Sequence, residues 1–296
     1  MELKENLNFL VVGAARDAEN TLHEDVAIIK KSLQNTKSIH WFFVESDSSD
    51  GTTATLQKLK NEVPNFNYIS LGHLSEKMEK RTERLAFCRN AYIKEIKTNY
   101  KNIDYVIVAD LDKLNQKLTP KAIDSCFVRD DWDMLSANQN GPYYDLWALR
   151  HEYWCPSDCW DSYRFFKKYM TQYGAAMENQ IFSKMITIPQ NSEWIEVDSA
   201  FGGLAIYKRR VFDLSEYNGV TDQGNEVCEH VYFHKILKEK NCKLFINPQL
   251  INADYTEMTL AMKTKYRYRR NFKNMILRVS PEFLRKRLLR LIDRLK

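Results

Sequence analysis

The stretch Tyr105-Val-Ile-Val-Ala-Asp-Leu-Asp112 decides how the chain is interpreted, because an apolar run ends there in two carboxylates one residue apart. The run suits one buried strand, and alternate residues of a strand point the same way, so Asp110 and Asp112 would present both side chains to one side. Neighbouring carboxylates repel each other unless a cation lies between them, and hard oxygen ligands suit Mg2+ or Mn2+. Mg2+ is usually held by one or two carboxylates, with substrate phosphates completing its shell. The stretch therefore predicts a metal site for a phosphate-bearing substrate.

Strands and helices alternate through the first half of the chain. The spacing predicts strands at residues 7–12, 39–44, 68–71 and 105–109, and helices at 25–33, 53–59 and 81–96. Such alternation predicts an α/β fold, with a mostly parallel central sheet and helices on both faces. Ligands of such sheets bind outside the carboxyl ends of the strands, where residues 13–16, 45–52 and 110–112 fall.

The second half is less regular. Residues 143–169 are dense in aromatic side chains, which charged and polar residues separate. Two apolar runs then flank Gly202-Gly203, and the spacing predicts a helix from Glu226 to Leu237 and a short strand at 244–248.

The composition is that of an ordinary globular protein, with 44% hydrophobic and 28% charged residues in 296. No stretch approaches the ~20 apolar residues that span a bilayer, and the N-terminal residues do not form a signal peptide. The six cysteines include no C-x-x-C pair. We therefore expect free thiols in a reducing cytoplasm rather than a zinc or disulfide site.

The charge is distributed unevenly. Residues 263–296 hold 13 Lys or Arg and 2 Asp or Glu, a local net charge of +11, whereas the whole chain carries +5. Ser280-Pro281-Glu282 is typical of a helix start, and a leucine-rich stripe with surrounding arginines follows it. A basic amphipathic helix at 280–296 indicates either an anionic membrane surface or docking on the body or in an oligomer interface. In the first case the protein would be peripheral at the inner membrane face.

The order of these motifs resembles that of the GT-A glycosyltransferases. Glu45, Asp47 and Asp50 stand as in the acidic turn of that family, and Asp110-Leu-Asp112 resembles its Asp-X-Asp metal motif. Arg89-Asn90 resembles its Ala-Arg-Asn helix motif, with Cys88 where alanine is usual. Residues 201–210 are similar to its acceptor-side glycine turn and strand, and Cys228-Glu-His230 falls at its late acidic residue. The resemblance covers about residues 7–255. It is greatest to fungal capsular mannosyltransferase-like enzymes and bacterial surface-polysaccharide transferases.

The resemblance implies a Rossmann-like GT-A catalytic domain at residues 1–258, followed by a basic helical tail at 259–296. Within that domain, 1–115 would bind the nucleotide sugar and 116–258 the acceptor. The implied activity is hexosyl or pentosyl transfer from a nucleotide-sugar donor to a glycan or lipid-linked acceptor, in capsule or other surface-polysaccharide or glycan synthesis. Mn2+ or Mg2+ held by Asp110 and Asp112 would stabilise the charge of the leaving nucleoside diphosphate.

The resemblance also assigns candidate site residues. The donor-binding candidates are Ala14, Arg16, Glu45, Asp47, Arg84, Arg89, Asp110 and Leu111. The acceptor-binding candidates are Trp147, Trp160, Gly202 and Gly203. Glu229 is the first candidate for the base that an inverting reaction needs, and Asp198 is the second. His230 and His234 share one face of the predicted helix and are candidates for a third metal ligand.

Each assignment has a structural alternative. The turn at 45–52 can simply cap the next helix, and Glu229 is also a typical helix-start acid. Arg89 can pair with a local carboxylate instead of a phosphate. The two histidines can be satisfied polar residues, the aromatic stretch can form core and lid, and Gly202-Gly203 can be a tight turn.

Other functions also remain open at this point. A nucleotidyl- or phosphoryl-transfer enzyme often has a glycine-rich loop after its first strand, whereas Gly13-Ala-Ala-Arg16 has a single glycine. A basic-tailed nucleic-acid-binding protein fits poorly with residues 1–262, whose charges sum to −6, so no nucleic-acid partner is expected. A scaffold that has lost its activity is the third alternative.

Overall fold

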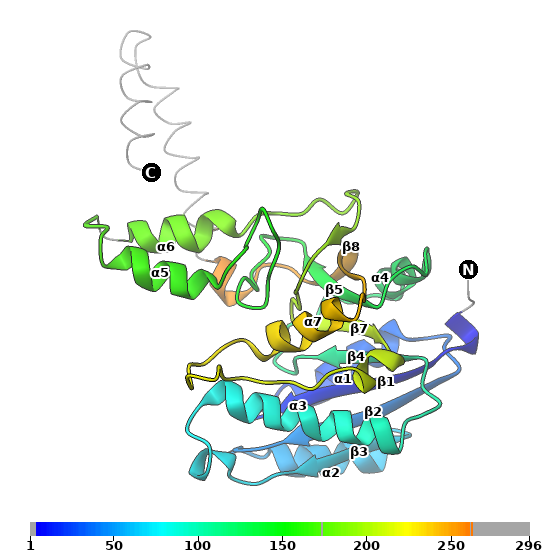
Figure 1. Ribbon diagram of the computed structural model, residues 1–296. Helices are drawn as coiled ribbons and strands as arrows, with labels where there is room; N and C mark the ends of the chain where they lie inside the picture. The colour runs from blue at the N-terminus through cyan, green and yellow to red at the C-terminus, as the bar shows by residue number, and fades with distance from the viewer. Residues whose placement is uncertain (1–3, 173, 261, 263–296) are drawn as a thin grey trace, which may run out of the picture. The chain divides into compact units, whose positions relative to one another are not determined.

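The computed structural model describes residues 4–172, 174–260 and 262. The chain divides into two compact units, Met1–Asp254 and Tyr255–Lys296. The first unit is built on an eight-stranded sheet with the strand order β3-β2-β1-β4-β7-β5-β8-β6 (Figure 1). The predicted tail helix at 280–296 lies outside the described residues.

The first half forms the parallel part of the sheet. Its strands are β1 (Asn8–Ala15), β2 (Ser38–Glu45), β3 (Phe66–Ser70) and β4 (Tyr105–Ala109). Its longer helices are α1 (Leu22–Ser32), α2 (Thr52–Glu62) and α3 (Arg81–Thr98), with short 3-10 turns at Lys4–Asn6 and Leu74–Glu76. β1 pairs in parallel with β2 and β4, and β2 pairs in parallel with β3. Each strand and helix predicted in this half is present, with boundaries shifted by a few residues.

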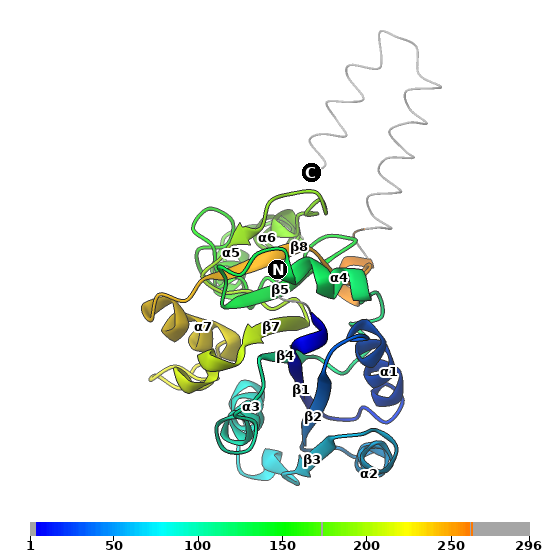
Figure 2. The same cartoon turned by 90° about the vertical axis from the view of Figure 1, so that its right-hand side faces the viewer.

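Helices cover both faces of this sheet, which confirms the predicted fold class. In Figure 2, α1 and α2 lie on one side of β1–β3, and α3 and α7 lie on the other. Every residue of β4 is buried, as expected for a strand covered on both faces. On the α1 and α2 side, Phe9, Trp41 and Phe43 belong to one hydrophobic core. Leu22, Val26 and Ile29, spaced on one face of α1, pack into the same core.

The second half completes the sheet around an antiparallel strand. Its strands are β5 (Met134–Gln139), β6 (Ile195–Glu196), β7 (Leu204–Lys208) and β8 (Leu244–Ala253). β7 lies between β4 and β5 and is antiparallel to both. The helices are α4 (Pro120–Asp124), α5 (Cys159–Lys167), α6 (Ala175–Gln180) and α7 (Glu229–Glu239). Further 3-10 turns span Ser125–Phe127, Phe182–Lys184 and Arg209–Asp213.

Two boundaries in this half differ from the prediction. The last helix begins at Glu229 rather than Glu226, because Glu226 forms an isolated bridge with Val220. β8 continues past Pro248 to Ala253, although proline cannot donate to a strand ladder. The pairing of β5 with β8 shifts register at this point, so Pro248 falls in the irregular part of the ladder.

Two further features of the described residues bear on the cysteines and on the helices. All six cysteines are buried and free. Among the described residues, no helix combines the length and apolar character needed to cross a membrane.

Candidate functional site

A cavity of about 380 Å3 opens at the carboxyl ends of β1, β2 and β4. Its other walls come from α3, the loop after β5 and the start of α7. Eleven of the candidate residues line it: Ala14, Arg16, Asp47, Arg84, Arg89, Asp110, Leu111, Asp112, Trp147, Glu229 and His230. The fold therefore gathers most of the candidates, from six separate segments of the chain, around one cavity.

Asp110 and Asp112 follow β4 rather than belonging to it, since the strand ends at Ala109. The Asp110 backbone is fixed on both sides: its N–H donates to the Gly203 carbonyl over 2.9 Å, and its carbonyl accepts from Asn115 Nδ2 over 2.8 Å. Burial raises the pKa of Asp110 to about 8; repulsion from Asp112 adds to this, whereas Arg89 lowers it. Such crowding of acidic groups favours a cation or a proton at this position. The described residues include no ready-made group of three His, Cys, Asp or Glu ligands.

Arg89 is a buried counterion. Its Nε donates to Glu229 Oε1 over 2.9 Å, and one of its terminal nitrogens lies 3.7 Å from Asp110 Oδ1. Its other terminal nitrogen donates to the Tyr92 hydroxyl over 3.2 Å, and its guanidinium lies 5.4 Å from the centre of the Phe201 ring. The side chain is only 4% exposed. Arg89 thus holds two site carboxylates, which is the structural alternative to diphosphate contact.

Three other arginines line the cavity. Arg84 is partly occupied, because it donates to the carbonyls of Met78 and Glu79 and lies 3.5 Å from Asp47. The Arg16 side chain is 56% exposed and lies 3.5 Å from Asp17, its neighbour in sequence. Arg81, which sequence reasoning did not single out, begins α3 and is exposed at the cavity wall.

Glu45 does not line the cavity. Its carboxylate accepts from the backbone N–H of Ser48 over 3.1 Å and from the Ser70 hydroxyl. It is 3% exposed and stabilises the turn after β2. Asp50 similarly accepts from the backbone of Glu19 and Thr52. Asp50 thus binds the first residue of α2, and Glu45 links the turn to β3, so both carboxylates serve the structure of the turn.

The two histidines have different surroundings. Both ring nitrogens of His234 are hydrogen-bonded, to Ser199 Oγ over 2.9 Å and to the Tyr207 hydroxyl over 2.8 Å, so this ring has no nitrogen left for a metal. His230 lines the cavity and stacks on Phe201 at 3.9 Å. Within the described part of the chain neither of its ring nitrogens has a hydrogen bond, and Nε2 lies 3.9 Å from Glu229 Oε1. Burial holds the pKa of His230 well below its usual value, so the ring is neutral, as a metal ligand must be.

Of the four acceptor-side candidates, one lines the cavity and three do not. Trp147 lines the cavity, whereas Trp160, Gly202 and Gly203 are not among its lining residues. The two glycines have φ of +70° and +81°, and a Cβ on Gly202 would come within 2.7 Å of the Ala137 carbonyl. They therefore form the close-packed turn that leads into β7. Asp198 is exposed and also lies outside the cavity lining.

Asp145 is a cavity residue that sequence reasoning missed. Its carboxylate accepts from the backbone N–H of Gly202 over 2.9 Å and from that of Ala148 over 3.4 Å. Burial raises the pKa of Asp145, with Glu229 adding repulsion and Arg89 opposing it. An acid directly after two tyrosines, within the aromatic stretch, is the sequence signal that marks this position.

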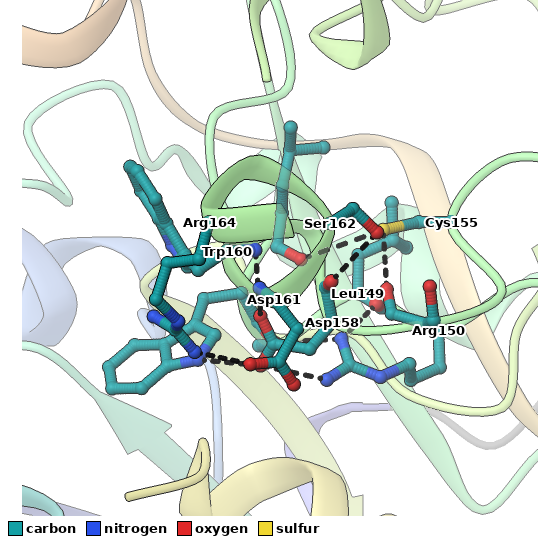
Figure 3. A network of polar contacts seen from close by, with 12 residues as sticks. Leu149, Arg150, Cys155, Asp158, Trp160, Asp161, Ser162 and Arg164 are labelled. Carbon is teal, nitrogen blue, oxygen red and sulfur yellow. Dashed lines mark hydrogen bonds and ion pairs between the residues drawn. The ribbon is translucent and has the colours of Figure 1, made fainter. Parts of the chain in front are cut away.

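A polar network supports the Trp147 wall from behind. Asp158 accepts from the Trp147 indole N–H over 3.0 Å and lies 3.3 Å from an Arg150 nitrogen. Its other oxygen caps α5 by accepting from the Trp160 backbone N–H over 2.8 Å. Figure 3 shows Asp158 at the start of α5, between the helix and Arg150. The cavity wall and the first turn of α5 are thereby joined.

Comparison with known proteins gives distant structural similarity alone. No protein-family model and no curated protein matches the sequence. Mannosyltransferase PcManGT from Pyrobaculum calidifontis, solved with GDP-Man and Mn2+, is similar at 12% identity and a TM-score of 0.48, over 84% of this chain and 56% of that one. S. aureus TarS 1–349 with UDP-GlcNAc is similar at 13% identity and a TM-score of 0.48, over 85% and 59%. Glucosyl-3-phosphoglycerate synthase from Mycobacterium tuberculosis, solved with UDP, is similar at 11% identity and a TM-score of 0.40, over 85% and 70%.

Proposed function

We propose that the protein is a metal-dependent glycosyltransferase that acts in the synthesis of a surface polysaccharide or glycan. The observation that carries the proposal is the composition of one cavity. Asp110 and Asp112 lie there with a neutral histidine, His230, whose ring nitrogens have no hydrogen bond among the described residues, and with exposed arginines at the rim. Hard carboxylate oxygens suit Mn2+ or Mg2+, and guanidinium groups suit the oxygens of a diphosphate.

The donor side follows from these groups. Asp110, Asp112 and His230 would hold the cation, which when bound supplies Lewis-acid stabilisation of the leaving diphosphate. Arg16 and Arg81 would contact the phosphates, because Arg89 is already committed to Glu229 and Asp110. Ala14 and Leu111 line the same cavity beside them and would pack against the nucleoside.

The acceptor side offers two carboxylates, Glu229 and Asp145, for removing a proton from the acceptor hydroxyl. The Glu229 carboxylate is already held by Arg89 Nε over 2.9 Å. Burial raises the pKa of Asp145, which makes it a stronger base than an ordinary aspartate. We therefore assign Asp145 as the base of an inverting reaction, and Glu229 as the residue that positions Arg89. Asp198, outside the cavity lining, has no role in this proposal.

A thermal-shift screen with UDP-, GDP-, CMP- and dTDP-sugars, each with and without Mn2+, tests the proposal. A ligand that binds only the folded state stabilises it by mass action and so raises the melting temperature. At a ligand concentration of a hundred times Kd, the free energy of unfolding increases by about 2.7 kcal/mol. We expect a shift with one nucleotide class that requires Mn2+ and is lost in Asp112→Ala. The exposed Asp222, outside the cavity lining, provides the matched control Asp222→Ala. Absence of a metal-dependent shift with all four classes would refute the proposal.

A further inference from the structure

The end of α5 exposes a surface that the cavity does not use. Residues 164–169 read Arg-Phe-Phe-Lys-Lys-Tyr, and all six are exposed. Phe165 is 55% exposed, Phe166 38% and Tyr169 69%. The Phe165 ring contacts the rings of Phe166 and Tyr169 at 5.3 and 5.1 Å, so these aromatics pack on one another. Within α5 itself, Cys159 is the one buried residue.

The charges of this segment all have one sign. Arg164, Lys167 and Lys168 alternate with the aromatic side chains, and residues 164–169 contain no acid. Arg164 forms an ion pair with Asp161, one turn earlier. Lys167 lies 5.7 Å from the Tyr163 ring, and Lys168 is exposed. Aromatic rings beside lysines and arginines match the boundary between lipid headgroups and acyl chains, where rings insert and cations meet anionic headgroups.

We propose that the α5 surface, residues 164–169, binds the surface of an anionic membrane. The charge of the segment is complementary to anionic headgroups, and each basic residue near such a surface adds to the attraction. A short helix end is small for a stable protein interface, which buries about 800 Å2 on each partner, whereas insertion of a few rings suffices for a lipid surface. This inference does not depend on the proposed function.

Hydrogen bonds hold the start of α5 against the rest of the fold. Asp158 caps the helix and also accepts from Trp147, a residue of the cavity wall. The network of Figure 3 therefore connects the membrane-binding helix to the side of the cavity assigned above to the acceptor. For the proposed transferase, this connection would favour an acceptor carried on a lipid.

Co-sedimentation of the full chain with vesicles tests the inference. The vesicles contain either phosphatidylcholine alone or about 30% phosphatidylglycerol. Binding is measured at about 0.15 M and at about 0.5 M salt. The higher salt screens binding that depends on charge alone, such as that of the basic residues of 263–296. The test variant is Phe165→Ser/Phe166→Ser/Tyr169→Ser. The matched control is Phe87→Ser/Tyr232→Ser, which changes two aromatics that are 45% and 41% exposed on other helices.

We expect the triple variant to bind anionic vesicles about tenfold more weakly or worse, with the loss persisting at high salt, and the control to bind like the natural chain. Hydrogen exchange should show protection of residues 160–170 by vesicles. Equal binding of the triple variant and the natural chain would overturn the inference. A natural chain that sediments as a dimer without lipid, and a triple variant that sediments as a monomer, would also overturn it in favour of a protein interface. If the triple variant fails to fold, Lys167→Glu/Lys168→Glu is compared with the natural chain at about 0.15 M salt, where it should bind anionic vesicles more weakly, and equal binding would overturn the inference.

Discussion

Replacing Asp25 with Asn should make the protein more stable at neutral pH. Asp25 lies in α1 with no exposed surface, and Oδ2 accepts from the Lys113 backbone N–H over 3.2 Å. Oδ1 has no hydrogen-bond partner in the described part of the chain. Burial raises the pKa of Asp25 from 3.8 to about 6, so the folded protein holds this proton more tightly than the unfolded chain. The natural chain therefore loses stability as the pH rises from about 4 to about 6.

The size of the effect follows from the shift in pKa. A difference of about two units, at 1.36 kcal/mol per unit, costs the charged natural chain about 3 kcal/mol above both pKa values. Asn carries no charge and can still accept from Lys113, but its amide would be unpaired where Oδ1 now lies, at a cost of about 1 kcal/mol. We expect Asp25→Asn to be about 2 kcal/mol more stable at about pH 7.5 and about 1 kcal/mol less stable near pH 4.

Urea unfolding followed by tryptophan fluorescence, in EDTA and at several values from about pH 4 to about pH 8, measures this difference. The exposed Asp222 provides the control Asp222→Asn, which should match the natural chain at each pH. A stability difference that does not change with pH would refute the argument from the buried charge. A less stable Asp25→Asn at about pH 7.5 would do the same.

Three further predictions concern the site. Arg89→Met leaves Glu229 buried without its counterion and should lower the free energy of unfolding, measured in urea, by about 3–5 kcal/mol. The double variant Arg89→Met/Glu229→Gln should recover much of that loss. A loss below about 1 kcal/mol in the single variant would contradict the counterion role. His230→Phe removes no hydrogen bond that the described residues form, so it should leave the melting temperature nearly unchanged. It should still weaken Mn2+ binding, measured by calorimetry, about tenfold, and unchanged Mn2+ affinity would exclude His230 as a ligand. In Gly202→Ala the new Cβ would clash with the Ala137 carbonyl at a position that also has a positive φ, so the variant should be destabilised by more than about 2 kcal/mol. Gly174→Ala has a positive φ but open space around the Cβ, and should cost about 1 kcal/mol. Equal losses in thermal unfolding would show that the contact with Ala137 does not matter.

The regular half of the fold could be predicted from the sequence because burial repeats there with a simple period. β4 reads as an uninterrupted apolar run, and α1 places Leu22, Val26 and Ile29 on one face. β5 was missed, because Ser136, Asn138 and Gln139 are polar yet wholly buried. Asn138 and Gln139 donate to the carbonyls of Pro248 and Gly202, and hydrogen bonds of that kind depend on partners distant in sequence.

The candidate site could be predicted as a set of segments but not as a set of roles. Asp110, Asp112 and Glu229 were marked by position, and all line the cavity. Whether an arginine faces a ligand or a carboxylate depends on which side chain lies opposite, so Arg89 and Arg81 could not be told apart from the sequence. The same holds for His230 and His234, which share a helix face but meet different neighbours.

The position of β7 also has a consequence for how the chain is made. β4 ends at Ala109, and the strand that covers its open side begins at Leu204, roughly 95 residues later. At a synthesis rate of about 5–20 residues per second, the nascent chain carries an unpaired, wholly apolar strand edge for about 5–20 seconds. The first half therefore emerges from the ribosome as an incomplete sheet that a chaperone can bind. The cavity, whose last wall begins at Glu229, forms only after this edge is closed.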